Sequence, residues 1–546
     1  MEQKSAVLEH AQPPRRPGPI VTAIVAVAAI AIVGVRLIGK LEHQPRLLDD
    51  PAVRNLIMLI CGFLAIASLW TWFCFRSGFS VAARRAAMIA PLAFVPLGFV
   101  WTLAIGPTHV IQFSGSMMPR IASRERPLQA IEATNSLVDL ATTTPDDFPQ
   151  FLGPQRNCWL PDHGLIPDWS ANPPRQLWKR PIGAGWSGFA AVNGYAITME
   201  QRGAEEAIVC YSIDTGEPVW GHTITARHEQ AMGGIGPRST PTIHNGRVYA
   251  LGATGILQCL DGKNGKPLWS SDLRKRYATT AREDEEMVMW GRAASPLIVD
   301  SLVVVPGGGK ARKNLVAFDM ETGKVVWEAE NQKDDGSLDQ IGYTSPSLAT
   351  LVGRRQIVIV NESTASGHDP ETGTCLWSFP WPGHSNGDAC NSQAAVVDDR
   401  HLLLSKGYSA GAELIEISEN GADGEFVAKS VWKVPRVLQT KFSNVVIHNG
   451  HAYGLSEEIL ECVDLKSGKR KWKSGRYGHG QILGVGDLLL VLAEEGELNL
   501  VELNPTKFVS HGSIQALEGK TWNNLCLDGK RLLIRNAQEA ACFELP

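Results

Sequence analysis

The 546-residue sequence predicts an all-β fold, an eight-bladed β-propeller of four-stranded blades, preceded by an α-helical region with three transmembrane spans. Two observations lead to this prediction. A strand and turn pattern that ends in tryptophan recurs through residues 147–546, and three long apolar runs lie within residues 20–105. The 53 glycines and 32 prolines fit many turns between short strands. The net charge of −4 gives no indication of a nucleic-acid partner.

The repeat is clearest at its last two strands, where an Asp and a Gly-containing turn precede the Trp. From Trp178 to Trp472 the repeat tryptophans are 42, 49, 58, 50, 55 and 40 residues apart. Each unit also carries a second turn, often of the hairpin type seen at Asn193-Gly194. Four antiparallel strands at this period are typical of a propeller blade. The copies are "CYSIDTGEPVW", "CLDGKNGKPLW", "AFDMETGKVVW", "GHDPETGTCLW", "CVDLKSGKRKW" and a degenerate one that reaches Trp432.

The number of blades follows from the third strands, which we count as eight. The last of them, in "AACFELP", has no Trp strand after it, whereas the strand "RQLWKRPI" around Trp178 precedes any complete blade. We therefore expect the N-terminal strand to complete the last blade and close the ring. Closure removes the free sheet edge that would otherwise invite aggregation.

The Asp-x-x-(Thr/Ser)-Gly-x-x-x-Trp repeat resembles that of the PQQ-like (pyrroloquinoline quinone) propellers, from about Asp147 to Pro546. That family includes quinoprotein alcohol and glucose dehydrogenases, and also cofactor-free scaffolds such as the outer-membrane assembly lipoprotein. The opening "DFPQFLGPQRN" and the C-terminal segment are similar to membrane-associated propellers of planctomycete-type bacteria. The resemblance implies that the repeat Trp packs between blades and is architectural.

The N-terminal part contains three apolar runs, Ile20–Ile38, Leu56–Phe75 and Ala86–Ile105, the last interrupted by Pro91 and Pro96. Each has the ~17–25 mainly apolar residues that a helix needs to cross a bilayer. A secretory signal peptide is the alternative for the first run. Against it, the run is long for a signal core, no A-x-A-like cleavage site follows, and two more runs come after.

These features predict a cytoplasmic tail at 1–18, three membrane helices in 19–110, a linker at 111–146 and the propeller at 147–546. Lys and Arg show a slight bias between the loops that favours a cytoplasmic N-terminus. Three spans would then place the propeller on the periplasmic side of a bacterial inner membrane, in a multi-pass protein held in the lipid by its helices.

Candidate site residues come from the turn before each innermost strand, because these turns gather around one mouth of the propeller axis. The eight positions hold Trp186, Arg238, Arg292, Tyr343, Asn391, Lys441, His479 and Trp522. Neighbouring polar residues are Gln201, Arg202, Gln393, Asn444, Arg476, Gln481 and Asn523.

The four cations Arg238, Arg292, Lys441 and Arg476 predict an electropositive funnel that attracts anions, since Arg recognises carboxylates in a planar, bidentate way. An aromatic face for stacking would come from the tryptophans of this ring. The alternative is structural, with the same side chains holding the blades together by hydrogen bonds to loop carbonyls. The residues alone leave both interpretations open.

For a cofactor, the resemblance implies PQQ held over calcium on the axis, with a Trp floor and, in the alcohol dehydrogenases, a disulfide between adjacent cysteines. This sequence has no adjacent Cys pair and no recognisable Glu/Asn/Asp calcium set or general-base Asp. The acids near the funnel are Glu200, Asp388 and Glu494. The sequence therefore contains no recognisable set of ligands for PQQ with calcium, and we assign no catalytic or metal-binding residue.

The other motifs in the sequence do not indicate a catalytic or metal-binding site. The segment "RHEQAM" at Arg227 begins like a zinc-protease helix, but Met232 stands where the second His is required. Spacing leaves a disulfide between Cys375 and Cys390 open. Four cysteines recur at one repeat position, where we expect a small buried apolar side chain: Cys210, Cys259, Cys462 and Cys542.

Two classes of function remain. The first, which the missing calcium and base residues favour, is a membrane-anchored scaffold without redox chemistry that binds an envelope protein or a small anionic ligand. The second is a PQQ-dependent quinoprotein dehydrogenase that oxidises alcohols or sugars and passes electrons to membrane quinone. Whether the protein is an enzyme therefore stays open at the level of sequence.

Overall fold

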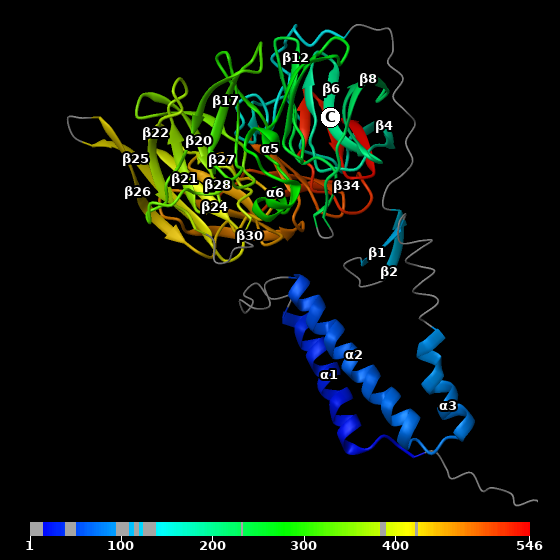
Figure 1. Cartoon of the computed structure of the whole chain (residues 1–546). Coiled ribbons are helices and arrows are strands. Elements are labelled where there is room, and N and C mark those ends of the chain that lie inside the picture. Colours follow the sequence, from blue (N-terminus) through cyan, green and yellow to red (C-terminus); the bar gives the residue numbers. More distant parts are fainter. Residues whose placement is uncertain are drawn as a thin grey trace, which may run out of the picture. The chain divides into compact units, whose positions relative to one another are not determined.

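The computed structural model describes residues 15–38, 51–93, 109–113, 119–123, 138–230, 233–382, 389–420 and 424–546 (Figure 1). The chain divides into two compact units, Met1–Arg124 and Glu125–Pro546. The first unit contains helices and a two-stranded sheet. The second contains the β-propeller.

In the first unit, α1 (Pro19–Ile38) and α2 (Pro51–Arg76) pack against each other, and α3 (Val81–Ile89) runs on into a 3₁₀ helix (Ala90–Ala93). Strands β1 (His109–Phe113) and β2 (Pro119–Ser123) pair antiparallel.

Among the described residues, one helical segment, Ile57–Arg76 in α2, is long and apolar enough to cross a membrane, with a mean hydropathy of 2.1. The apolar part of α1, Pro19–Val35, is shorter. The predicted region of three spans is therefore not confirmed. In the third run the α-helix ends at Ile89, and Pro91, which lacks a backbone N–H, lies in the 3₁₀ turn that follows. Residues 94–105 of that run lie outside the described part of the chain.

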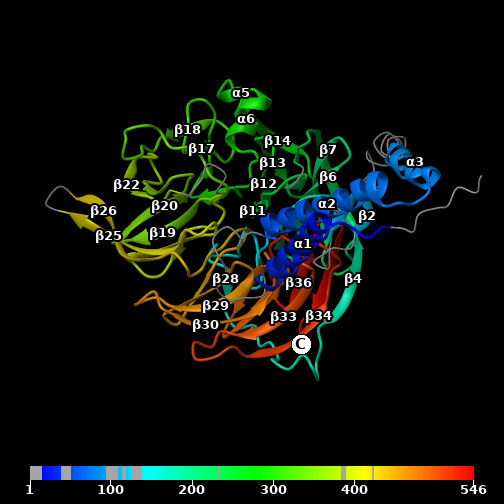
Figure 2. The same ribbon diagram turned by 90° about the horizontal axis from the view of Figure 1, so that it is seen from below.

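The second unit confirms the eight-bladed propeller, because eight sheets follow one another around a ring (Figure 2). Seven of them are four-stranded and antiparallel, and the eighth has four antiparallel strands and a fifth strand, β3, added at its inner edge. We number the blades 1 to 8 along the chain from β5. Blades 1 to 4 are β5 (Ala190–Val192), β6 (Tyr195–Arg202), β7 (Glu205–Ser212), β8 (Pro218–Thr225); β11 (Thr242–His244), β12 (Arg247–Leu251), β13 (Ile256–Asp261), β14 (Pro267–Asp272); β15 (Leu297–Val299), β16 (Leu302–Val305), β17 (Leu315–Asp319), β18 (Val325–Ala329); and β19 (Ser347–Leu351), β20 (Arg354–Val360), β21 (Thr364–His368), β22 (Cys375–Pro380).

Blades 5 to 8 have the same order of strands, and the first strand of each blade is the innermost, since first strands of neighbouring blades contact each other. These blades are β23 (Ala395–Val396), β24 (His401–Lys406), β25 (Gly411–Asn420), β26 (Glu425–Val434); β27 (Val446–His448), β28 (His451–Ser456), β29 (Ile459–Asp464), β30 (Arg470–Arg476); β31 (Gln481–Val485), β32 (Leu488–Leu492), β33 (Glu497–Glu502), β34 (Ser510–Gln515); and β35 (Cys526–Asp528), β36 (Arg531–Arg535), β37 (Glu539–Glu544), β4 (Arg175–Pro181).

Outside the blades lie β3 (Trp159–Leu160), the short pair β9 (Glu229–Gln230) and β10 (Gly234–Ile235), and helices α5 (Leu273–Arg276) and α6 (Ala281–Met287). The hairpin of β25 and β26 is longer than the corresponding hairpins and projects from the ring (Figure 1).

The ring closes as predicted. Strand β4 from the N-terminal side pairs antiparallel with β37 at the C-terminus, and Trp178 lies opposite Cys542 (Figure 2). The blade that completes the ring thus takes strands from both ends of the propeller sequence.

The segment 147–172, which we call the arm, crosses the ends of several innermost strands. Phe148 bridges to Ala191 in blade 1, and the Pro149 carbonyl accepts a hydrogen bond from Ile243 in blade 2. Strand β3 adds to blade 7 by pairing in parallel with β31. The arm therefore ties blades together across the axis. Contacts with the propeller begin before the arm, since Val138 and Leu140 are buried between blades 1 and 2.

In most blades the repeat tryptophan joins the blade to the next one. The Trp220 indole Nε1 donates to the Gly262 carbonyl of blade 2 at 3.0 Å, and the Trp220 ring covers Gly265. Gly265 has φ of +71°, and a Cβ there would lie 2.5 Å from the ring. Four other pairs have the same arrangement: Trp178 on Gly216, Trp269 on Gly323, Trp327 on Gly373 and Trp432 on Gly468.

Blade 4 departs from this pattern. The Trp377 indole donates to Gln356 Oε1 of its own blade at 2.6 Å. The next blade has the degenerate repeat. The sequence of its long hairpin has no Thr-Gly turn that could lie against the Trp377 indole. Blade 7 has Gly512 in place of the repeat Trp, and Trp169 of the arm packs there, 3.1 Å from the position that a Gly512 Cβ would take.

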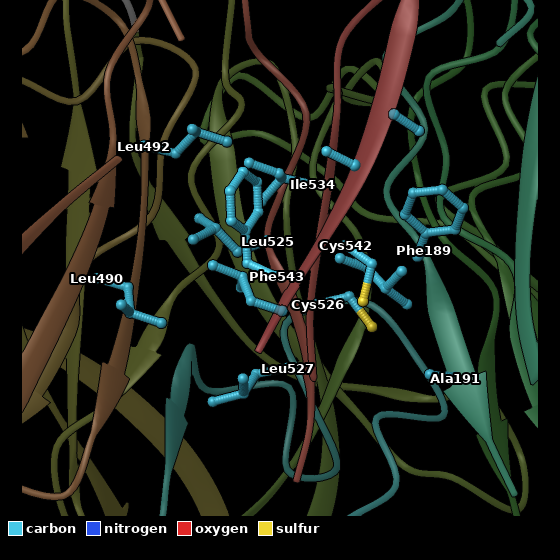
Figure 3. Packing of buried hydrophobic residues seen from close by; sticks show 14 of the residues in the cluster. Phe189, Ala191, Leu490, Leu492, Leu525, Cys526, Leu527, Ile534, Cys542 and Phe543 are labelled. Atoms are coloured by element: carbon cyan, nitrogen blue, oxygen red, sulfur yellow. The ribbon is translucent and has the colours of Figure 1, made fainter. Parts of the chain in front are cut away.

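The recurring cysteines are core residues, as predicted. Cys210, Cys259, Cys462 and Cys542 each have no exposed surface. Figure 3 shows Cys526 and Cys542 among Leu527, Ile534 and other apolar side chains of blades 7, 8 and 1.

The contact between Trp and Gly predicts that Gly265→Ala destabilises the propeller more than Gly194→Ala. Both glycines have positive φ, +71° and +78°, so both substitutions cost about 1–2 kcal/mol of backbone strain. Only Gly265 is covered by an indole, and overpacking adds about 1–3 kcal/mol. Thermal unfolding of the full-length protein, followed by Trp fluorescence, measures the difference. Equal shifts in Tm would contradict the proposed packing role of the repeat Trp.

Candidate functional site

The mouth of the axis is lined by an aromatic cluster. The ring centroids of Trp186 and Trp522 are 5.0 Å apart, and Phe442 lies 4.8 Å from Trp522 and 5.4 Å from His479. All four side chains are partly exposed. The structure thus brings together the mouth residues of blades 1, 7 and 8 that the sequence predicted, and adds Phe442 to them.

Glu494 fixes two members of this cluster. Its Oε1 accepts from the Trp522 indole at 2.9 Å, and its Oε2 accepts from the His479 backbone N–H at 3.0 Å. Burial is the main cause that lowers the pKa of the His479 imidazole, with the Glu494 carboxylate opposing it. His479 is therefore neutral at neutral pH, and the mouth carries a carboxylate beneath its aromatic surface.

Three of the predicted cations are paired with carboxylates. Arg292 lies 2.6 Å from Asp284 of α6, and both side chains are buried. Lys441 lies 3.3 Å from Glu457. Arg476 pairs with Glu458 at the end of β30.

The fourth cation, Arg238, donates to the backbone carbonyls of Gly233, Gly234 and Gly236. Burial is the main cause that raises the pKa of Tyr343 to about 12, and Arg238 opposes it. The Tyr343 hydroxyl accepts from the backbone N–H of Trp290 at 3.5 Å. The charges of the predicted funnel are therefore largely satisfied inside the protein.

Three polar residues hold the loops of the mouth. Asn523 donates to the carbonyls of Gly185 and Ser187, at 3.1 and 2.8 Å, and so joins blade 8 to blade 1. Gln481 donates to the Phe442 carbonyl at 2.7 Å, which joins blade 7 to blade 6. Asn391 likewise donates to the carbonyl of Lys441 at 2.8 Å. These contacts correspond to the structural alternative considered for the sequence.

Other predicted residues lie apart from the aromatic cluster. Glu200 has no exposed surface and accepts hydrogen bonds from the Tyr211 hydroxyl and the Gly183 N–H, with Arg202 3.3 Å away. Asp388 lies outside the described residues. Gln393 and Asn444 line a cavity beside the arm.

Two buried ionisable residues were not among the predicted site residues. Glu206 is 2% exposed and accepts from the Ala253 N–H, and no described residue donates to its Oε1. Burial raises the pKa of Glu206 to about 7, although Arg238 opposes this. Burial and Arg238 together lower the pKa of His228 to about 4, and His228 Nε2 has no hydrogen-bond partner within the ranges that the structure describes. The sequence "RHEQ" drew attention to His228 for a metal motif, and no local pattern distinguished Glu206 from Glu205.

The residues present do not fit PQQ over calcium. Within the described ranges, no group of three His, Cys, Asp or Glu side chains could hold a metal ion. Of the candidate acids, Glu200 is closed in by its partners, and both Glu494 oxygens accept hydrogen bonds. Cys375 and Cys390 are free thiols in this structure.

Residues 169–361 match the family model described as outer membrane protein assembly factor BamB. The chain is 29% identical over 164 residues to BamB of Kangiella koreensis, covering 29% of this chain and 36% of that protein. It is 24% identical over 191 residues to the quinoprotein alcohol dehydrogenase PedH of Pseudomonas putida, covering 34% and 29% of the two chains. It is 23% identical over 300 residues to a polyvinylalcohol dehydrogenase of a Pseudomonas species, covering 44% and 45%.

Each of these matches spans less than half of the relative's own length. Among solved structures, quinohemoprotein alcohol dehydrogenase ADHIIG of Pseudomonas putida HK5 aligns with a TM-score of 0.50 at 12% identity, covering 73% of this chain and 80% of that one. This likeness concerns the fold. Together with the family match, it confirms the predicted resemblance to PQQ-like propellers.

The raised pKa of Glu206 predicts that Glu206→Gln stabilises the protein at pH 8 and changes little at pH 5. A folded-state pKa of about 7, above the ordinary 4.5, means that the folded protein loses stability as the pH rises from 4.5 through 7. The loss is roughly 3 kcal/mol, and the neutral amide avoids it. Thermal unfolding of the wild type and the variant at both pH values measures this, with the exposed neighbour Glu205→Gln as control. The same gain at pH 5 and pH 8 would contradict ionisation as its cause.

Proposed function

We propose that this PQQ-like β-propeller is a binding scaffold of the bacterial cell envelope, without redox chemistry, and that its axial mouth binds a protein partner. The observation that carries the proposal is the partly exposed cluster of Trp186, Phe442, His479 and Trp522. Large aromatic side chains at the centre of a patch supply most of the binding energy in protein interfaces, because they bury much area at a low entropy cost.

The charges of the mouth support a protein rather than a small anion as the occupant. Arg292, Lys441 and Arg476 already have carboxylate partners, and Arg238 is held by backbone carbonyls. A polycarboxylate would have to displace these partners before the cations could bind it. For the buried pair of Arg292 and Asp284, breaking the contact costs several kcal/mol, on the order of 3–5.

Attachment to the membrane is part of the proposal. Helix α2 contains the apolar segment Ile57–Arg76, which is long enough to span a bilayer, and the apolar part of α1 adds a shorter one. We propose that α2 crosses the bacterial inner membrane once and anchors the chain there, which from a cytoplasmic N-terminus puts the propeller on the periplasmic side. Relatives named as outer membrane assembly factors support an envelope location and a protein partner.

The second candidate function is a PQQ-dependent dehydrogenase. The relatives PedH and quinoprotein ethanol dehydrogenase have names that describe this activity. Glu494 is the acidic residue at the mouth that such an enzyme would have to use, and it would first have to give up its hydrogen bonds from the Trp522 indole and the His479 backbone N–H.

The scaffold proposal predicts no saturable binding of PQQ in the micromolar range. Isothermal titration of the full-length protein in detergent, with and without calcium, measures it. Tight binding that is lost in Arg238→Ala, together with dye reduction in the presence of alcohols, would overturn the scaffold in favour of the dehydrogenase.

The aromatic cluster also predicts the site of partner contact. A photo-reactive phenylalanine analogue in place of Phe442 should form a discrete cross-linked product in intact cells. The same analogue at Leu268, an exposed residue on the outermost strand of blade 2, should not form it. Trp522→Ala should weaken the captured partner's binding by about 2 kcal/mol, or about thirtyfold. Identical products from both positions, or unchanged affinity in the Trp522 variant, would argue against a docking surface at the mouth.

A further inference from the structure

One aromatic side chain of the mouth already binds a cation within the protein. The Lys520 ammonium lies over the Trp522 ring, 4.3 Å from the ring centroid. This distance is well inside the ~6 Å within which an indole face attracts a cation. Lys520 is exposed and forms no ion pair among the described residues, so its ammonium can leave the ring without breaking a salt bridge. The Trp522 face is therefore a cation-binding surface covered by an exchangeable group.

The Trp522 ring is held in one orientation. Its indole Nε1 donates to Glu494 Oε1 at 2.9 Å, and its ring packs against those of Trp186 and Phe442. Because the protein itself fixes the ring, a group that binds there loses little affinity to ordering of the indole. The neighbouring rings are partly exposed and add apolar surface next to the cation-binding face. The mouth thus combines a place for one positive charge with apolar surface around it.

The charges beside Trp522 favour a positively charged partner. The loop of Trp522 and the loop to which it is hydrogen-bonded carry one cation, Lys520, and three carboxylates, Glu494, Glu495 and Glu518. The donors to Glu494 are uncharged indole and backbone N–H groups. Glu495 and Glu518 are exposed and form no ion pair among the described residues. A cation from a partner therefore meets an excess of negative charge, which is the complementarity that selects partners at interfaces.

We propose that the partner places an arginine flanked by apolar residues at the mouth, and that its guanidinium replaces the Lys520 ammonium on the Trp522 face. A guanidinium suits this place better than an ammonium, because it is planar, stacks on aromatic faces and is more weakly hydrated. The exposed carboxylates nearby balance its charge, and the flanking apolar residues pack on the rest of the aromatic cluster. The arginine belongs to the protein partner of the proposed function, on which this assignment rests.

The test is isothermal titration of the full-length protein in detergent with two peptides that differ in one side chain. The first is acetyl-Gly-Leu-Arg-Leu-Gly-amide, and the second carries citrulline, an uncharged group of the same shape, in place of the arginine. Both peptides have the same apolar residues, which controls for partitioning into detergent. We expect saturable binding of the arginine peptide, about fivefold tighter than that of the citrulline peptide, because the attraction to the indole face depends on the charge.

Two variants show whether the peptide arginine takes the place of Lys520. Lys520→Gln should bind the arginine peptide about threefold more tightly, because no internal cation competes for the ring. In a Trp522→Leu background the same exchange should leave the affinity unchanged, since the competition takes place on the indole. Lys507→Gln is the control for net charge, because this exposed lysine lies between β33 and β34, at the end of blade 7 opposite to the mouth.

Absence of saturable binding of the arginine peptide, or equal affinities for the two peptides, would overturn the proposal. A gain from Lys520→Gln that persists in Trp522→Leu would do the same, because it would come from net charge and not from the ring. If Trp522→Leu does not fold, the two peptides and Lys520→Gln still decide. Equal peptide affinities together with a discrete cross-link from Phe442 would leave the proposed function in place and remove only the arginine.

Discussion

The docking of a repeat tryptophan on the glycine of the neighbouring blade is the contact on which the ring depends. The indole N–H satisfies a backbone carbonyl at the turn, and the ring covers a glycine that cannot carry a Cβ there. One contact thus combines apolar burial, a hydrogen bond and a required left-handed residue. Where the repeat is degenerate, the local solution changes. In blade 4 the Trp377 indole donates a hydrogen bond to Gln356 of its own blade. In blade 7, which has no repeat Trp, Trp169 of the arm packs at Gly512.

Once the ring is closed, the two ends of its axis acquire different chemistry. At the mouth, the charges are compensated, as Arg292 with Asp284 and Lys441 with Glu457 illustrate, and aromatic side chains remain at the surface. At the arm, the buried Arg156 donates to Gln150 and to backbone carbonyls and has no carboxylate partner among the described residues. The difference has a physical basis, because charges compensated within the fold stabilise the loops, whereas an uncompensated charge favours a ligand of opposite sign. The mouth is therefore suited to a surface contact.

The positions of the mouth residues around the axis could be predicted from sequence. The partners that compensate their charges could not. The turns before the innermost strands lie together as expected, since position in the repeat determines position around the axis. Arg238 and Arg476 nevertheless do not form an open electropositive funnel, because backbone carbonyls and Glu458 occupy them. Glu206 was missed since its neighbour Glu205 has the same local sequence environment, and only the pairing of β6 with β7 and the approach of blade 2 bury one and expose the other. Phe442 was missed because it follows Lys441 directly, and its contacts with Trp522 and His479 come from other blades.

The sequence by itself determined the architecture: a repeat of strands and turns with Trp at regular intervals, eight units, and closure by the strand around Trp178. Such features are local, so each copy of the repeat carries its own evidence. The N-terminal apolar runs predicted membrane-spanning helices less well. Hydropathy measures how apolar a run is and not where its helix ends, and α3 ends at Ile89, two residues before Pro91. Only the tertiary structure decided which charges are compensated, that Glu494 joins Trp522 to His479, and that Arg156 is buried with no counter-charge among the described residues. These depend on contacts between residues tens to hundreds of positions apart, and neither composition nor spacing encodes such contacts.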